Sequence, residues 1–353
     1  MKKYILLILV VLTLTGCKND KKDYGTPGKS DAVKESIEND NINIVLDMEI
    51  IDFDGEAILV KKNNNYGIVD LKGQFIIEPI YEELSLFKEK LALAKKNGKF
   101  GFIDELGKMI IPFIYDDAKS FSGDLALVKK DSKWGYVNHL GDVVISFDYV
   151  EASALSEDKA VISNGRNKGY IDANGKVILD YQYQDAKNFN RDLAPVLKNG
   201  KWGYINPEGV LSILYQYDDA SEFSHNGYAS VLKNGKWGLI DAKGNVVIDF
   251  KYEKLIESGE NRIIAVMDGK YGIIDREDKA IVDFKYEEML ESADDLIAVR
   301  QNDKWGYIDA TGNIVLEFQY DKALNFKDNL AKVQKNDKNM IIDKQGKIIL
   351  IEK

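Results

Sequence analysis

One unit of about 34 residues repeats along most of the chain and constrains the fold more than any other feature. Aligning the copies gives a column with tryptophan in four copies and tyrosine or phenylalanine in three. The column consists of Tyr66, Phe100, Trp134, Lys168, Trp202, Trp237, Tyr271, Trp305 and Asn339. Such a period is typical of proteins in which each unit buries its apolar face against the next one.

Two more columns keep the same phase. Glycine follows the aromatic column in eight of the nine copies, and Met340 is the exception. A tyrosine stands fifteen residues after the column in every copy that continues that far. A single extra residue fits best at His225–Gly227, where the pattern predicts a loop. The nine copies are therefore in register from about residue 44 to the last residue.

Each unit is predicted to be β structure. Leu193–Leu197 has strand character, and Asn199-Gly200 supplies the two positive φ angles of a type I′ hairpin turn. Lys201–Asn206 is the second strand, and a turn from Asn206 to Gly209 follows it. That turn opens with aspartate or asparagine in all copies and closes with glycine in eight. A third strand runs to the tyrosine, and the stretch after it is a short fourth strand or a return loop.

The predicted fold is all-β, with nine tandem antiparallel units in a propeller-like ring. The alternative is an open β-solenoid, in which the units stack linearly. We also expect the aromatic ring of one unit to lie over backbone that the glycine of a neighbouring unit leaves bare. The tyrosine fifteen residues on is expected to cap the same stack.

The units resemble the WG repeat of bacterial proteins, whose core is Lys-Trp-Gly-Tyr-Ile-Asp. Lys133–Asn138 and Lys304–Asp309 carry this core. The resemblance covers residues 44–353 and implies a β-repeat architecture, mostly without known activity. The Asn-Gly-Lys-Trp hairpin is also similar to choline-binding repeats of bacterial cell-wall proteins. Those repeats have a second aromatic residue where this chain has glycine.

The first seventeen residues form a separate segment. Lys2 and Lys3 precede an apolar run, Ile5–Leu14, which is too short to remain as a membrane span. The run ends in Leu14-Thr15-Gly16-Cys17, which resembles the lipobox of bacterial lipoproteins. The resemblance implies cleavage after Gly16 and thioether-linked diacylglycerol on Cys17. Two or more acyl chains make a stable membrane anchor, where one would be marginal.

Three regions follow from this segmentation. They are a signal peptide at 1–16, a lipidated cysteine with a flexible polar tether at 17–40, and a repeat domain at 41–353. The expected location is the cell membrane or the outer membrane, on the extracytoplasmic face, with the membrane contacted through the lipid anchor.

Composition excludes several classes of function. The net charge is −10, and an acidic chain repels the phosphates of nucleic acids. One cysteine and two histidines leave no set of ligands for zinc or an iron–sulfur cluster, and one acid per turn is too few for calcium. His139 and His225 are expected in surface loops, and adjacent acids such as Asp116 and Asp117 point to opposite faces of a strand. We therefore expect no catalytic residue, metal or cofactor, and no enzyme activity.

The remaining classes are binding functions. The first hypothesis is a non-catalytic binding or scaffold module for protein partners. The alternative is a module that binds cell-wall glycan through exposed aromatic rings. The candidate binding residues are Trp134, Trp202, Trp237 and Trp305, although the period and the glycine column favour a packing role for them. The departures at Lys168 and Asn339 are interpreted as drift or end-capping rather than as a site.

Overall fold

The computed structural model describes residues 44–55, 57–259, 261–291 and 295–353, which belong to one compact unit, Ser36–Lys353. Its sheets are nine antiparallel arrays of four strands, and the last array carries β1 as a fifth. We number them blades 1 to 9 in chain order, from β2–β5 to β34–β37. The all-β prediction is confirmed.

Every blade has the same succession of four strands. Blade 1 consists of β2 (Glu49–Asp54), β3 (Ala57–Lys62), β4 (Asn65–Asp70) and β5 (Phe75–Tyr81). Blades 2 to 4 are β6 (Glu83–Leu84), β7 (Leu91–Lys96), β8 (Lys99–Asp104), β9 (Met109–Tyr115), β10 (Asp117–Ala118), β11 (Ala126–Lys130), β12 (Lys133–Val137), β13 (Val143–Tyr149), β14 (Glu151–Ala152), β15 (Lys159–Ser163), β16 (Lys168–Asp172) and β17 (Val177–Tyr183). Blades 5 and 6 are β18 (Asp185–Ala186), β19 (Ala194–Lys198), β20 (Lys201–Ile205), β21 (Leu211–Tyr217), β22 (Asp219–Ala220), β23 (Tyr228–Lys233), β24 (Lys236–Asp241) and β25 (Val246–Tyr252). Blades 7 to 9 are β26 (Lys254–Glu257), β27 (Ile263–Met267), β28 (Lys270–Ile274), β29 (Ala280–Tyr286), β30 (Glu288–Met289), β31 (Ile297–Gln301), β32 (Lys304–Ile308), β33 (Ile314–Tyr320), β34 (Lys322–Ala323), β35 (Leu330–Lys335), β36 (Lys338–Asp343) and β37 (Ile348–Glu352).

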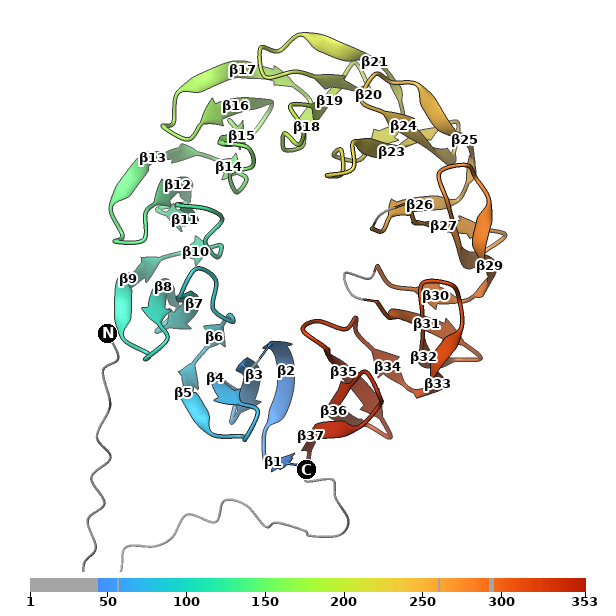
Figure 1. Cartoon of the computed structure of the whole chain (residues 1–353). Helices are drawn as coiled ribbons and strands as arrows, with labels where there is room; N and C mark the ends of the chain where they lie inside the picture. The colour runs from blue at the N-terminus through green and yellow to red at the C-terminus, as the bar shows by residue number, and fades with distance from the viewer. Residues whose placement is uncertain (1–43, 56, 260, 292–294) are drawn as a thin grey trace, which may run out of the picture. The chain divides into compact units, whose positions relative to one another are not determined.

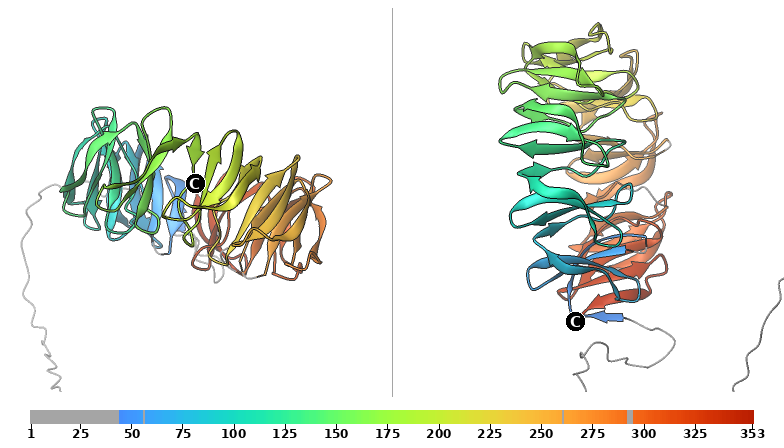
Figure 2. Two further views of the ribbon diagram at one scale, coloured as in Figure 1. Left: turned by 90° about the horizontal axis from the view of Figure 1, so that it is seen from above. Right: turned by 90° about the vertical axis from the view of Figure 1, so that its left-hand side faces the viewer.

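The blades are arranged around a ring. The short first strands, such as β10 and β14, lie towards the middle, and the fourth strands, such as β9 and β13, lie on the circumference (Figure 1). Successive sheets pack face to face around the ring (Figure 2). The stretch after each tyrosine that stands fifteen residues beyond the aromatic column is therefore a short strand and not only a return loop. It forms the first strand of the following blade.

The two ends of the repeat array meet. β1 (Ile44–Leu46) pairs in parallel with β37, with Ile44 opposite Leu350. The Lys332 ammonium donates to the carbonyl of Ile51 at 2.9 Å, and a buried cluster combines residues of blades 1 and 9. The repeats thus close into a nine-bladed β-propeller, and the open solenoid is excluded.

The predicted turns are present. Asn199 and Gly200 have φ angles of 53° and 73°, as a type I′ hairpin turn requires. In the second turn, Asp104 Oδ1 accepts the backbone N–H groups of Leu106 and Lys108 at 3.0 and 2.9 Å. Asp278 stands where the other copies have glycine and adopts a φ of 65°, a conformation that aspartate tolerates.

The expected role of the glycine column is wrong in one respect. A Cβ on Gly101 would lie 2.6 Å from the Ile111 carbonyl oxygen and 2.9 Å from the Phe113 ring, both on the outer strand of its own blade. The cause is a register shift that brings β9 close to β8 between Phe100 and Phe102. Tyr115 pairs directly with Phe100 across these two strands, and its ring also packs against Phe147 of the next blade, with ring centres 6.3 Å apart.

The segment with Cys17, the signal sequence and the tether lies outside the described residues. In the part of the chain that the structure covers, no helix has the length and hydropathy needed to cross a membrane.

Candidate functional site

The aromatic column joins each blade to the next one. Trp202 on β20 and Ala220 on β22 belong to one buried cluster between blades 5 and 6, and Phe100 with Ala118 forms the same pair between blades 2 and 3. Further pairs are Tyr66 with Leu84, Trp134 with Ala152, Trp237 with Leu255, Tyr271 with Met289 and Trp305 with Ala323. Among the described residues, seven of the interfaces therefore have a slot in which a ring faces a residue of the next inner strand.

The four tryptophans predicted as candidates lie in four different blades, and the fold does not bring them together. Trp202 and Trp305 are buried, with 7% and 8% of their surface exposed, whereas Trp134 and Trp237 are half-buried. The Lys187 ammonium lies 5.0 Å from the centre of the Trp202 ring, and the Lys129 ammonium lies 5.5 Å from that of Trp134. All four rings thus take part in packing between blades.

A buried tyrosine two residues after the column strengthens four interfaces. The Tyr204 hydroxyl donates to the carbonyl of Ser221 in the next blade at 2.8 Å. Tyr136, Tyr170 and Tyr307 make the equivalent bond. Burial raises the pKa of the Tyr204 hydroxyl well above its usual value, so it remains a hydrogen-bond donor.

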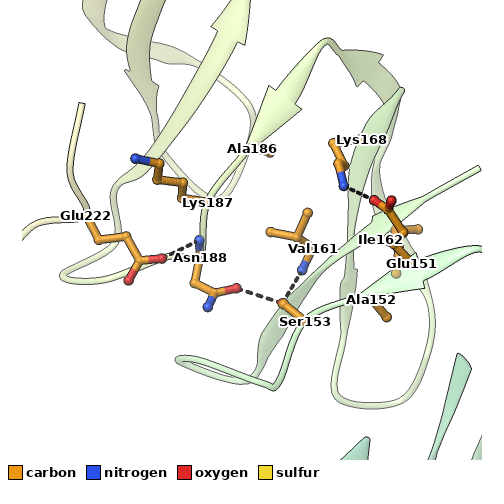
Figure 3. A pocket seen from close by; sticks show the side chains of 10 residues that line it. All are labelled: Glu151, Ala152, Ser153, Val161, Ile162, Lys168, Ala186, Lys187, Asn188 and Glu222. Atoms are coloured by element: carbon orange, nitrogen blue, oxygen red, sulfur yellow. Dashed lines mark hydrogen bonds and ion pairs between the residues drawn. The ribbon is translucent and has the colours of Figure 1, made fainter. Parts of the chain in front are cut away.

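The interface between blades 4 and 5 departs from this pattern. Lys168 takes the place of the aromatic residue. The residue on the facing inner strand, Ala186, is small, like Ala220, which faces Trp202 at the next interface. A half-open pocket of about 290 Å³ lies here (Figure 3). It is lined by Glu151, Ala152, Ser153, Val161, Ile162, Lys168, Ala186, Lys187, Asn188 and Glu222. The pocket therefore occupies the slot that a ring fills elsewhere.

The polar groups around the pocket bind one another. The Lys168 ammonium forms an ion pair with Glu151 on the inner strand of the same blade. The Lys187 ammonium donates to the carbonyl of Ala220 at 2.6 Å. Two lysines and two glutamates line the pocket, so their formal charges cancel.

Main-chain and side-chain hydrogen bonds fix the inner wall of the pocket. Glu222, from blade 6, accepts the backbone N–H of Asn188 at 2.9 Å. The Asn188 side chain in turn accepts a hydrogen bond of 2.7 Å from the Ser153 hydroxyl (Figure 3). Residues of three successive blades are thereby linked along the wall, so its shape is set before any ligand arrives.

The histidines lie apart, in turns of blades 3 and 6. His139 stacks on Phe121, with ring centres 4.1 Å apart, and its Nε2 lies 2.9 Å from Glu89. His225 is exposed, and its carbonyl accepts a hydrogen bond from Arg191 at 2.7 Å. Both occur in loops, as predicted, although His139 is half-buried.

Adjacent acids serve different parts of a blade. Asp218 accepts the backbone N–H of Asn234 at 2.8 Å and pairs with Lys201, whereas Asp219 accepts the N–H of Ala220. The two carboxylates do not converge on one point. Among the residues described, no group of three or more histidine, cysteine, aspartate or glutamate side chains is placed to hold a metal ion.

The pocket is not predicted from the sequence. The interpretation of Lys168 as drift or end-capping differs from what the structure places there. The combination of a lost ring with a retained small residue, Ala186, eighteen positions further on, is the signal that would have identified it. Lys187, Asn188 and Glu222 carry no signal of their own, because they vary from copy to copy.

Similar solved structures agree with the fold. The crystal structure of a eukaryotic initiation factor matches with a TM-score of 0.61 at 12% identity, over 83% of this chain and 94% of that one. Dihydro-heme d1 dehydrogenase NirN matches at 0.45 and 14% identity, over 83% and 72% of the two chains. Hsv2p of Kluyveromyces lactis matches at 0.39 and 11% identity, over 64% and 92%. The first likeness shows the fold alone, and the other two carry no argument.

The repeats also match a family model in sequence. No curated protein was found to match this chain. The model described as WG containing repeat matches residues 66–100, 100–134, 134–167, 169–202, 202–237, 237–271, 271–305 and 305–338. These segments cover more than half of the chain and coincide with the aromatic column. The chain belongs to the family of proteins built from WG-containing repeats.

Proposed function

We propose that the propeller is a non-catalytic binding and scaffold module for protein partners. We further propose that a lipid on Cys17 holds it at the cell membrane or outer membrane, on the extracytoplasmic face. The observation that carries the first proposal is the circumference of the ring, where strand edges and apolar side chains are both exposed.

The outer strands carry apolar side chains in contact with solvent. Leu214 on β21 is 68% exposed and Ile80 on β5 is 52% exposed. Further exposed apolar residues on outer strands are Phe75, Ile76, Met109, Ile114, Val143, Val144, Val177, Leu211, Val246, Ile314 and Val315. Exposed apolar residues along open strand edges favour pairing with another polypeptide.

The chain itself demonstrates such pairing. β1 adds to the outer edge of β37 as a parallel strand (Figure 1). Within the described residues, the outer strands of blades 1 to 8 have no such additional strand. An extended segment of a partner added to one of these edges would gain main-chain hydrogen bonds and apolar contacts together.

The burial of the rings favours a protein partner over a cell-wall glycan. Sugar binding by stacking needs an open aromatic face, but Trp202 and Trp305 are buried between blades. Among the four candidate tryptophans, the alternative therefore rests on Trp134 and Trp237, which are half-buried and lie in different blades.

Cross-linking in intact cells, followed by recovery of the tagged full-length protein, tests the scaffold proposal. We expect the wild-type protein to recover a partner and Leu214→Asp or Val144→Asp to lose most of it, because a charge on the outer strand opposes burial. Asp249→Asn, a conservative change on the outer strand β25, is the control. Equal recovery by all variants, with tight sedimentation on purified cell wall, would favour the glycan alternative.

A fatty-acid analogue tests the anchor. Wild-type protein should incorporate the label, and Cys17→Ser should not, because the acceptor thiol is absent. A version with an ordinary secretory cleavage site in place of Thr15–Cys17 should leave the membrane fraction. Label on Cys17→Ser, or membrane retention of the secreted version, would place the anchor elsewhere.

A further inference from the structure

The pocket between blades 4 and 5 lies in the slot that an aromatic ring occupies at the neighbouring interfaces. At the interfaces on either side, Trp134 faces Ala152 and Trp202 faces Ala220. At this interface Ala186 is retained, but the facing residue is Lys168. We infer that the pocket binds a single aromatic side chain, tryptophan or tyrosine, of a partner polypeptide; this inference rests on the proposed function.

The apolar part of the pocket fits a ring. Ala152, Val161, Ile162 and Ala186 provide the same kind of surface that covers Trp202 one interface further on. The volume of about 290 Å³ lies just below the roughly 300–1,000 Å³ typical of ligand pockets. It therefore suits one ring system rather than an extended oligosaccharide.

The charged part of the pocket fits a ring that is neutral and has a polar edge. An ammonium group interacts favourably with the face of an aromatic ring, as the Lys187 ammonium does with Trp202 at the neighbouring interface, and Lys168 brings such a group to this pocket. The carboxylates of Glu151 and Glu222 are acceptors for an indole N–H or a phenol O–H. Because the lysine and glutamate charges cancel, no net charge is required of the ligand.

The openness of the pocket favours a side chain over a free small molecule. Ligand pockets for free molecules usually cover most of the ligand surface. This pocket is open on one side, so a ring could be covered while the main chain that carries it remains outside. Tryptophan and tyrosine are also the residues that most often anchor protein interfaces.

Binding of blocked amino acids to the purified full-length protein tests the inference. The probes are N-acetyl-tryptophanamide, N-acetyl-tyrosinamide and, as a non-aromatic control, the amide of N-acetyl-cyclohexylalanine, followed by saturation-transfer NMR. We expect the aromatic probes to bind with a dissociation constant on the order of 1 mM and the cyclohexyl probe to bind much more weakly.

Two substitutions should close the pocket in different ways. Lys168→Trp supplies a ring from the chain itself, and Ala186→Leu introduces the larger residue that blades 2 and 7 have at this position, Leu84 and Leu255. Each should weaken binding of the aromatic probes roughly tenfold or more. Lys176→Trp, at an exposed position of the same blade, should leave binding unchanged.

Three results would overturn the inference. They are equal probe binding by all variants, absence of aromatic binding to the wild-type protein, and binding of free indole without binding of the blocked amino acids. The partner cross-link separates this inference from the proposed function. If Lys168→Trp recovers the partner as well as wild type does, the scaffold proposal stands and the pocket inference fails. If Leu214→Asp is the variant that no longer recovers the partner, the outer strands bind the partner without the pocket.

Discussion

Two neighbouring interfaces of the ring share the same strand arrangement and differ in the residue that occupies the slot. Between blades 5 and 6 the slot holds Trp202, and between blades 4 and 5 the same position is Lys168. The tyrosine bond to the next blade is the same in both, because Tyr170 and Tyr204 each donate to a carbonyl at 2.8 Å. The ring contacts beside it also agree, at 4.8 and 4.9 Å between centres.

The comparison separates two parts of the interface. The buried tyrosine and the phenylalanine next to it occur at both interfaces, as Tyr170 with Phe189 and as Tyr204 with Phe223. This pair therefore holds the neighbouring blades at the same spacing with or without a ring in the slot. The slot is a second part that can lose its ring without loss of the fold. A repeat of this kind can therefore change the slot for binding while the tyrosine contact maintains the geometry.

The largest expected difference is in stability. Trp202→Ala removes a buried ring and should lower the free energy of unfolding by about 3–5 kcal/mol. Lys168→Ala removes a partly exposed ion pair with Glu151 and should cost less than about 1 kcal/mol. Urea denaturation followed by circular dichroism measures both. Similar losses for the two variants would mean that the slot contributes equally with and without a ring.

The reverse substitution should remove part of the difference. Lys168→Trp places a ring opposite Ala186 and should raise the free energy of unfolding by about 0.5–2 kcal/mol, as cavity-filling changes do. Its melting temperature should rise relative to Lys176→Trp, which adds the same ring at an exposed position. A fall in melting temperature would show that the pocket cannot hold an indole.

Much of the architecture could be predicted from the sequence, because the period, the Asn-Gly turns and the aspartate turns are local patterns with a local cause. Closure involves contacts between the two ends of the chain, among them Ile44–Leu46, which pair with a strand more than 300 positions away. No spacing in the repeats indicates that pairing. The choice between ring and solenoid therefore needed the structure.

The candidate site shows the same limit. Lys168 is visible as a departure, but the slot is formed with Ala186, Lys187 and Glu222 from the next two blades. The glycine column differs from expectation for a related reason: the register shift beside Gly101 is a property of strand pairing that the sequence does not display. Features within one hairpin were predictable, and features between strands or blades were less so.

Removing the shared tyrosine bond should affect both interfaces equally. Tyr204→Phe and Tyr170→Phe each delete a buried hydroxyl and leave the carbonyl of Ser221 or Lys187 without that donor. Each should lower the free energy of unfolding by about 1 kcal/mol, measured by urea denaturation. A much larger loss for Tyr170→Phe would indicate that the interface without a ring depends more on its tyrosine.

The smallest expected difference depends on pH and concerns the residue after each column tyrosine. Asp218, beyond β21, accepts the N–H of Asn234 in the hairpin turn of blade 6, whereas Gln184, beyond β17, accepts that of Gly200 in blade 5. The hydrogen bond from Lys201, and then that from Asn234, lower the pKa of Asp218 below its usual 3.8. A lowered pKa in the folded state contributes stability above about pH 4 that is lost as the pH falls through the folded value.

Exchanging these two side chains therefore tests the comparison at its finest level. Asp218→Gln should flatten the decline in melting temperature between about pH 4 and pH 2, because its amide does not titrate there. Gln184→Glu should steepen the decline, since it introduces a carboxylate at the same place in blade 5, next to the Gly200 N–H. The side-chain effect is small because Asp218 is largely solvated, so melting curves at several pH values must be compared with wild type. If Gln184→Glu left the slope unchanged while Asp218→Gln flattened it, the ion pair with Lys201 would account for the acid sensitivity and the turn contact would not.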